Sequence, residues 1–242
     1  MRILNWNTQA DKLTPASERF KRVRNHIARF DADIICLTEA YPGLMPRGGQ
    51  TISSELSIWE PYESRGARKV VLHSRAGWSH VDKQINSQLP EGRFISATTE
   101  IEGMVWTIVG MCIPWHGYRT SKSKWGDKSL DKWQGACRYL ATLRKGILPK
   151  QSERQRTILV GDFNLQIPAR GYPAARSDVN QQRRLTLSGW LIPTSGIRRH
   201  FIDHVAMSTD LQVECLRFIS KVAPDGQQFS DHNGVCIDLA SV

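Results

Sequence analysis

The stretch over residues 156–164, Arg-Thr-Ile-Leu-Val-Gly-Asp-Phe-Asn, indicates both the fold and a candidate site. It begins as an apolar, β-branched run of the kind that forms a buried strand, and it ends in Gly161-Asp162-Phe163-Asn164. A carboxylate at the end of a buried strand costs free energy unless it is paired or holds a metal ion. Ile202-Asp203-His204 and Ser230-Asp231-His232 occupy comparable junctions. We therefore expect these three acidic strand ends to share one site.

Apolar runs alternate along the chain with a few amphipathic stretches. The spacing of Phe20, Val23, Ile27 and Phe30 predicts a helix over 18–30, and related patterns predict helices from about residue 129 and over 178–187. Strands are predicted at 2–8, 33–38, 69–73, 93–101, 105–113, 156–161, 201–207, 213–219 and 235–239. Because composition does not break along the chain, we expect one domain over residues 1–242, an α/β fold of two packed sheets with helices outside.

The charge balance favours a polyanionic partner. The 242 residues include 33 Lys and Arg against 23 Asp and Glu, which gives a net charge of +10. Binding to phosphates releases condensed counterions, so a basic surface favours nucleic acid or phospholipid. The alternative is that the charge serves solubility alone.

Cysteine usage and hydropathy indicate the compartment. The five cysteines form no CxxC pair and mostly lie in apolar runs, which favours a reducing environment. The first residues lack the apolar stretch of a secretory signal, and no apolar run approaches the ~20 residues of a membrane span. We therefore expect a cytoplasmic protein without stable membrane insertion, and no protein partner is inferred.

Polar side chains with oxygen ligands gather at the predicted strand ends. Such a set, with one imidazole and without a cysteine pair, suits a hard cation such as Mg²⁺, with Mn²⁺ as an alternative, better than zinc. The residues are Asn7, Glu39, Asp162, Asn164, Asp203, Asp231 and His232.

Taken in order, five segments of the chain resemble the endonuclease/exonuclease/phosphatase superfamily, the fold of DNase I. They are Asn5-Trp6-Asn7, Ile34 to Glu39, Gly161 to Asn164, Ile202-Asp203-His204-Val205 and Ser230-Asp231-His232. The resemblance covers nearly the whole chain and implies a four-layer α/β sandwich, with two packed, mainly antiparallel β-sheets flanked by helices. It also implies a metal-dependent hydrolase that acts on phosphoester bonds.

The resemblance implies roles for the site residues. Glu39 is expected to be the principal metal ligand, with Asn7 and Asp231 nearby. Asp162 is expected to orient or deprotonate the attacking water, and Asn164 to hold the scissile phosphate.

Two further roles concern charge in the transition state. His232 is expected to donate a hydrogen bond to a non-bridging oxygen, and Asp203 to fix its tautomer and keep it cationic.

Two departures from the family pattern bear on the substrate. Gln9 stands where abasic-site endonucleases place an acidic residue, which predicts weaker metal affinity. Cys112-Ile113-Pro114-Trp115, followed by His116, replaces their tyrosine and asparagine and argues against abasic-site repair. His116 is a candidate general acid toward the leaving oxygen; the alternative is a surface loop residue.

A loop that mixes aromatic and basic residues follows His116 and is expected to bind substrate. Aromatic side chains in such a loop stack on bases, and basic side chains neutralise phosphates. The candidate contacts are Tyr118, Arg119, Lys122, Lys124, Trp125, Arg170 and Tyr172. We expect a monomeric nuclease that cleaves DNA or RNA. The alternatives are a small-phosphoester phosphatase, a sphingomyelinase-like phospholipase, or a catalytically silent nucleic-acid-binding module.

Overall fold

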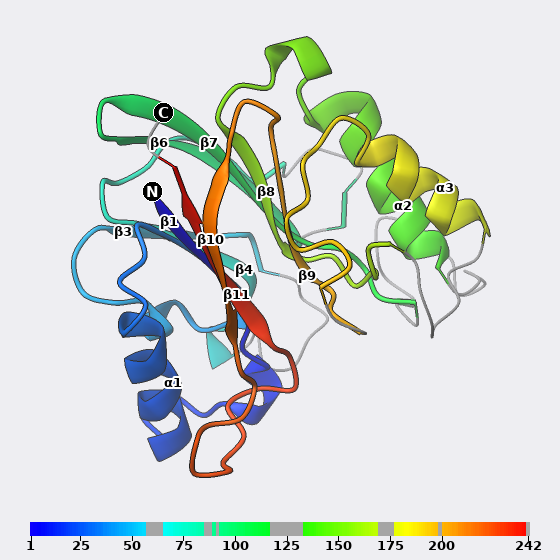
Figure 1. The fold of residues 1–242 in the computed structure, drawn as a ribbon. Coiled ribbons are helices and arrows are strands. Elements are labelled where there is room, and N and C mark those ends of the chain that lie inside the picture. Colours follow the sequence, from blue (N-terminus) through cyan, green and yellow to red (C-terminus); the bar gives the residue numbers. More distant parts are fainter. Residues whose placement is uncertain are drawn as a thin grey trace.

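The computed structural model describes residues 1–56, 65–84, 89–90, 92–116, 133–168, 177–197 and 200–240. Its strands form two sheets that pack face to face (Figure 1). The first sheet has the order β10 (Val213–Ile219), β11 (Gly234–Leu239), β1 (Arg2–Asn7), β2 (Ile34–Ala40), β4 (Arg68–Ser74), β3 (Gln50–Ser53). The second has the order β5 (Ser79–Asp82), β6 (Phe94–Ile101), β7 (Met104–Cys112), β8 (Thr157–Asp162), β9 (Asp203–Met207).

Both sheets are mixed but mainly antiparallel. β1 runs parallel to β2, and β7 runs parallel to β8, whereas the other neighbouring pairs are antiparallel. The two parallel pairs place the ends of β1 and β2 together in one sheet and the ends of β7 and β8 together in the other. Loops that follow these strands therefore emerge at one edge of the sandwich.

Helices cover the outer faces of both sheets, so the molecule has four layers (Figure 1). α1 (Glu18–Ala28) packs on the first sheet, and α2 (Gln134–Thr142) and α3 (Ser177–Thr186) pack on the second. Three buried clusters fill the three spaces between layers. The predicted four-layer sandwich is confirmed. Shorter helical segments are Ala10–Lys12, Pro42–Leu44, Leu143–Ile147 and Gln151–Glu153.

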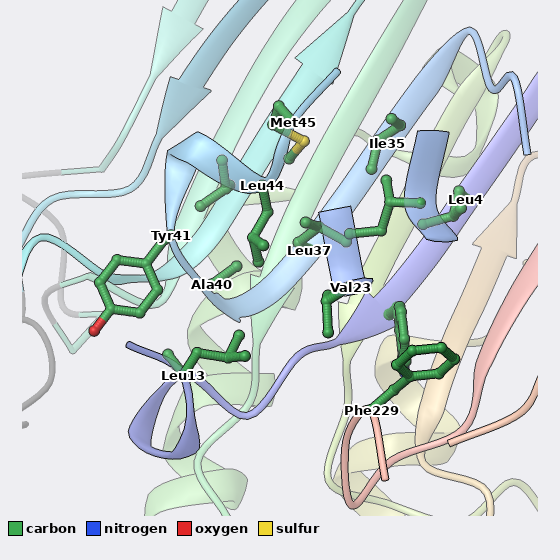
Figure 2. Packing of buried hydrophobic residues seen from close by; sticks show 14 of the residues in the cluster. Leu4, Leu13, Val23, Ile35, Leu37, Ala40, Tyr41, Leu44, Met45 and Phe229 are labelled. Carbon is green, nitrogen blue, oxygen red and sulfur yellow. The ribbon is translucent and has the colours of Figure 1, made fainter. Parts of the chain in front are cut away.

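The sequence of α1 explains its position. The Ser17 hydroxyl accepts a hydrogen bond from the amide of Phe20 and caps the helix. Phe20, Val23 and Ile27 lie on one stripe and are buried against the first sheet. Figure 2 shows Val23 in this cluster, close to Leu37 of β2. Burial of each such side chain contributes about 1.5–3 kcal/mol.

Three features differ from the prediction made on the sequence. β3 and β5 are edge strands whose residues are largely exposed, so they lack the apolar alternation that marks a strand. α2 begins at Gln134 because Trp133, directly before it, has a left-handed backbone (φ 77°). The predicted start near residue 129 falls within 117–132, outside the residues that the structure describes.

No helix in the described part of the chain is both long and apolar enough to cross a bilayer.

Candidate active site

The site lies where the inward-facing rows of three strands reach the edge of the sandwich. Alternate residues of β1, β8 and β9 point into the core between the sheets, as Ile3, Ile158, Val160, Val205 and Met207 show. The same rows end in Asp162 and Asp203, and in β1 they continue through Asn5 to Asn7. The period of two therefore places an amide and two carboxylates at the end of the inter-sheet core.

Asp162, Asp203 and His232 form the centre of the site. Asp162 lies opposite Asp203 in the antiparallel pairing of β8 with β9. Nδ1 of His232 lies 2.6 Å from Oδ2 of Asp203, and one ligand atom from each of the three residues lies within 4.8 Å of the others. Two strands of one sheet and a loop before β11 of the other therefore converge as the sequence predicts.

Two asparagines hold the carboxylate of Asp162. Nδ2 of Asn7 donates to Oδ2 of Asp162 at 3.1 Å, across the gap between the sheets. The backbone amide of Asn164 donates to Oδ1 at 2.8 Å, and its Nδ2 donates to Oδ2 at 3.0 Å. Asn164 has a left-handed backbone (φ 52°), which turns its side chain back toward Asp162. The carboxylate is thus fixed in one orientation.

Gly161 is required by the close approach of β7. It has φ 144°, and a Cβ there would lie 1.9 Å from the carbonyl oxygen of Met111. A side chain at this position would push β8 away from β7 and displace Asp162. Phe163, on the other side of Asp162, is buried in the cluster beneath α2 and α3.

Burial raises the pKa of Asp162 to about 7, and the negative charge of Asp203 adds to the shift. Asp203 shows the same direction: burial raises its pKa, while the contact with His232 opposes the rise. Oδ1 of Asp203 is buried without a hydrogen-bond partner. The site is therefore short of positive charge at its centre, which is the condition that a bound metal cation relieves.

His232 is held in its cationic form. Burial alone would lower its pKa, but Asp203, Asp162 and Asp231 outweigh burial and raise the pKa to about 10. A protonated imidazole has no lone pair for a metal ion. With Nδ1 bonded to Asp203, the ring has its Nε2 left to donate a hydrogen bond toward a substrate oxygen, so the three residues form an acid–base arrangement.

The turn over residues 230–232 is tied to β1. The Ser230 hydroxyl donates to the carbonyl oxygen of Asn7 at 2.7 Å and accepts from the amide of His232 at 3.1 Å. The indole nitrogen of Trp6 donates to the carbonyl oxygen of His232 at 2.9 Å. These bonds fix the histidine relative to Asn7 and hence to Asp162.

Asn7 is buried, and its side chain is engaged at both ends. Oδ1 accepts from the amide of Gln9 at 3.0 Å, while Nδ2 donates to Asp162. Gln9 has a left-handed backbone, and its own side chain accepts from Arg19 at 3.3 Å. The hydrogen bond from Asn7 orients Asp162, and one lone pair of Asn7 Oδ1 remains for a metal ion.

Glu39 lies within β2, where the sequence pattern placed the end of the strand. Its backbone is left-handed (φ 46°), which interrupts the alternation of side chains along the strand. Leu37 and Ala40 therefore pack in the same buried cluster, although two residues separate them. Oε1 of Glu39 lies 2.9 Å from Nζ of Lys69 in β4. Burial opposes ionisation of Glu39, but the charge of Lys69 outweighs it and lowers the pKa below the usual value. The side chain remains 25% exposed.

Two buried cations near Glu39 were not recognised in the sequence. Lys69 lies opposite Glu39 because Thr38 pairs with Val70, one position away. Arg93 precedes β6, and its guanidinium donates to the carbonyl oxygen of Cys112 at 3.2 Å; its charge also lowers the pKa of Glu39. An isolated basic residue next to a strand carries no signal of its own, and only the pairing of the strands indicates its partner.

Asp231 and His116 lie at the margin of the described site. Oδ1 of Asp231 lies 3.9 Å from Nε2 of His232, and its side chain is 50% exposed. The ring contacts of His116 are to Trp115 and Trp133, with centroids 5.0 and 5.4 Å apart. Neither contact links His116 to the aspartates, so its role as general acid stays a prediction.

The predicted substrate contacts lie outside the described residues. They are Tyr118, Arg119, Lys122, Lys124, Trp125, Arg170 and Tyr172.

His204, which follows Asp203, faces away from the site. Nδ1 lies 3.0 Å from the Thr194 hydroxyl, and Nε2 lies 3.0 Å from the carbonyl oxygen of Leu165. Burial lowers the pKa of His204 to about 4, so the ring is neutral. Its function is structural, because successive residues of a strand point to opposite faces.

The donor set fits a hard dication. Glu39, Asp231 and Asn7 offer oxygen atoms around the centre, and burial together with the charge of Asp203 raises the pKa of Asp162. With a fixed carboxylate that can accept a proton and an imidazolium that can donate a hydrogen bond, the arrangement can hydrolyse a phosphoester.

The fold is shared with known phosphoester-cleaving proteins. The structure of the 3′ phosphatase NExo from Neisseria bound to a product DNA hairpin matches with a TM-score of 0.70 at 18% identity, over 100% of both chains. The human Nocturnin catalytic domain with a bound sulfate anion matches with a TM-score of 0.70 at 18% identity, over 99% of this chain and 94% of that chain.

A third structure, D. rerio TDP2 complexed with a single-strand DNA product, matches with a TM-score of 0.63 at 11% identity, over 100% of this chain and 99% of that chain. No curated protein sequence matches the chain. The model of the endonuclease/exonuclease/phosphatase family, however, matches residues 4–232. The carboxylates, asparagines and imidazolium of the site lie at one edge of a four-layer sandwich. This chain therefore belongs to that family of phosphoester-hydrolysing enzymes.

Proposed function

We propose that this protein is a Mg²⁺-dependent phosphodiesterase that cleaves nucleic acid. The observation that carries the proposal is the pairing of two opposed groups: Asp162, whose pKa is raised to about 7, and His232, whose pKa is raised to about 10. Near neutral pH one is a base of matched strength and the other is a cation. Hydrolysis of a phosphodiester needs both functions at once.

Glu39 and Asp231 would hold the metal ion, together with the free lone pair of Asn7 Oδ1. When bound, Mg²⁺ supplies electrostatic stabilisation of a phosphoryl oxygen. Mg²⁺ is preferred because the described ligand candidates, Glu39, Asp231 and Asn7, all offer oxygen atoms. Mn²⁺ also prefers oxygen ligands.

The chain's own residues assist the remaining steps, in which water attacks phosphorus, the P–O bond to the leaving oxygen breaks, and that oxygen takes a proton from the candidate acid His116 or from water. Asp162 accepts a proton from the attacking water, and Asn7 and Asn164 keep the accepting oxygen pointed at it. His232 donates a hydrogen bond to a non-bridging oxygen as negative charge develops there, and Asp203 keeps the imidazole cationic and oriented.

Nucleic acid is the favoured substrate because the chain carries a net charge of +10. Two proteins of the same fold are described in complex with a DNA hairpin product and with a single-strand DNA product. A small phosphoester lacks the repeated charge that a basic chain would recognise.

The test uses a panel of labelled single- and double-stranded DNA, RNA, 3′-phosphorylated DNA, inositol phosphates and sphingomyelin, with Mg²⁺, Mn²⁺ or EDTA. We expect cleavage of DNA or RNA that EDTA abolishes. Asp162→Asn and His232→Ala are each expected to lower the single-turnover rate by at least ~100-fold, the scale of lost acid–base or charge stabilisation. Exposed Arg24→Gln, on the helix α1, is the control.

Activity restricted to inositol phosphates or sphingomyelin would contradict the nucleic-acid substrate. Near-normal rates in either variant would remove the role assigned to that residue.

A further inference from the structure

The side chain of Lys69 is almost fully buried and lies against the expected metal ligand. Its ammonium is 2.9 Å from Oε1 of Glu39, and its side chain is 3% exposed. Burying a lysine ammonium costs free energy, and an exposed basic residue could also neutralise Glu39. Neutralisation alone therefore does not account for the burial of Lys69. The pair therefore places a fixed positive charge where a metal ion would bind.

The charges around the centre support this interpretation. Within the described residues, the site holds four carboxylates that interact electrostatically and three cations that act on them. The cations are Lys69, Arg93 and His232, and the carboxylates are Glu39, Asp162, Asp203 and Asp231. With these seven groups ionised, one negative charge remains; the ammonium of Lys221, 3.5 Å from the carbonyl oxygen of Asp231, lies outside this set.

One dication would leave the site with a single positive charge, which matches the single negative charge of a phosphodiester. A second dication would add two more positive charges beside three side-chain cations, and the repulsion at short range would oppose it. Lys69 thus supplies a positive charge beside Glu39 that competes with the first metal ion and adds to the repulsion that a second would meet.

We propose that Lys69 acts as a built-in cation at Glu39, so that the site takes a single divalent metal ion and takes it in competition with Lys69. The inference rests on the proposed metal-dependent function and goes beyond it, since it sets both the number of metal ions and the residue that limits their affinity. Lys69 is a positioning residue here: it acts through Glu39.

The experiment is a calorimetric titration of the metal-free protein with Mn²⁺ at pH 7.5, with electron paramagnetic resonance of free Mn²⁺ as a second measure. We expect one Mn²⁺ per chain whose binding is lost in Glu39→Gln. Lys69→Met is expected to bind Mn²⁺ at least ~10-fold more tightly. The repulsion between an ammonium and a metal ion a few ångströms apart, at an effective dielectric constant of ~20, is larger than the free energy that corresponds to a tenfold change in affinity.

Matched variants separate charge from packing. Lys69→Arg keeps the charge and should retain an affinity close to that of the wild type, whereas Lys69→Gln removes the charge but keeps a hydrogen-bond donor and should follow Lys69→Met. Lys21→Met removes an exposed lysine that is paired with Glu18 and should change nothing. Saturating Mn²⁺ should also raise the melting temperature of Lys69→Met more than that of the wild type, because tighter binding to the folded state stabilises it more.

Two results would overturn the inference: an unchanged or weaker Mn²⁺ affinity in both Lys69→Met and Lys69→Gln, or two Mn²⁺ per wild-type chain that both depend on Glu39. A wild-type chain that binds no Mn²⁺ would overturn the proposed function as well. If Mn²⁺ binds at Glu39 and nucleic acid is cleaved while the Lys69 variants behave as wild type, only the present inference fails.

Discussion

At the scale of single residues, the site sets two neighbouring groups at opposite protonation states. Burial and Asp203 raise the pKa of Asp162 to about 7, whereas three aspartates outweigh burial and raise the pKa of His232 to about 10. Separated pKa values of this kind assign one group as base and the other as hydrogen-bond donor. The separation arises from the site's own charges, so it should be measurable in pH profiles.

We predict a bell-shaped pH dependence of kcat/KM. Activity should rise as Asp162 loses its proton, at or below about pH 7 once a metal ion adds its positive charge, and fall as His232 loses its proton near pH 10. Rates in saturating Mg²⁺ on a short DNA substrate measure it. In His232→Gln the alkaline limb should disappear along with most of the activity, and an unchanged alkaline limb would exclude His232 as its source.

We also predict that Asp162→Asn stabilises the metal-free protein at neutral pH. The unfolded chain releases this proton near pH 3.8, but the folded protein keeps it until about pH 7. Between these values the unfolded state binds fewer protons, so the free energy of unfolding falls as pH rises and stays low above pH 7. The gain in the variant should therefore grow from pH 4 to pH 8 and reach up to about 4 kcal/mol.

Urea denaturation at several pH values in EDTA tests the prediction. If the difference in the free energy of unfolding between Asp162→Asn and the wild type does not change with pH, then folding does not raise the pKa of Asp162.

At the scale of elements, two short turns position the chemistry. The turn after β8 bends Asn164 back onto Asp162, and the turn before β11 holds His232 against β1 through Ser230 and Trp6. Because the turn before β11 bonds to the backbone of Asn7, and Asn7 in turn bonds across the sheets to Asp162, the site depends on how the sheets meet.

We expect Ser230→Ala to loosen this attachment. The variant loses the bond to Asn7 and the acceptor for the His232 amide, which should cost about 1–2 kcal/mol of stability. Since the histidine then moves relative to Asp162, kcat should fall by ~10-fold or more with little change in KM. Ser220→Ala, which removes an exposed hydroxyl that accepts from Val222, is the control. An equal loss in both variants would show a general effect on stability alone.

At the scale of the whole molecule, four layers place all of these groups on one edge, and the site there includes three buried or half-buried cations. The chain as a whole carries a net charge of +10, which attracts a polyanion. The loop over residues 118–125 lies outside the described residues, and its role in binding is a hypothesis based on its sequence.

We predict that neutralising Lys122 and Lys124 together weakens binding of long nucleic acid without affecting the chemistry. The KM on a long substrate should rise, and the slope of log affinity against log salt should fall by up to ~2 units, because two phosphate contacts are lost. A dinucleotide substrate should show unchanged rates. If the double variant binds a long substrate with the same salt slope as the wild type, the loop is a solvated surface and small phosphoesters become the favoured substrates.

The sequence alone predicted the strand that ends in Asp162, the strand around Asp203 and the helix α1, because each rests on local periodicity. The two packed sheets with helices outside followed from the order of these elements, and the four-layer class from the resemblance carried by five ordered segments. The sequence did not determine β3 and β5, whose exposed residues follow no pattern and become strands only through a neighbour.

Only the tertiary structure decided which cations face Glu39. Lys69 lies 30 residues away in the chain and meets Glu39 through the pairing of β2 with β4 and the left-handed backbone of Glu39 itself. Arg93 reaches the same site from another sheet. Charges that are distant in sequence influence one another through space, and no local pattern records that distance.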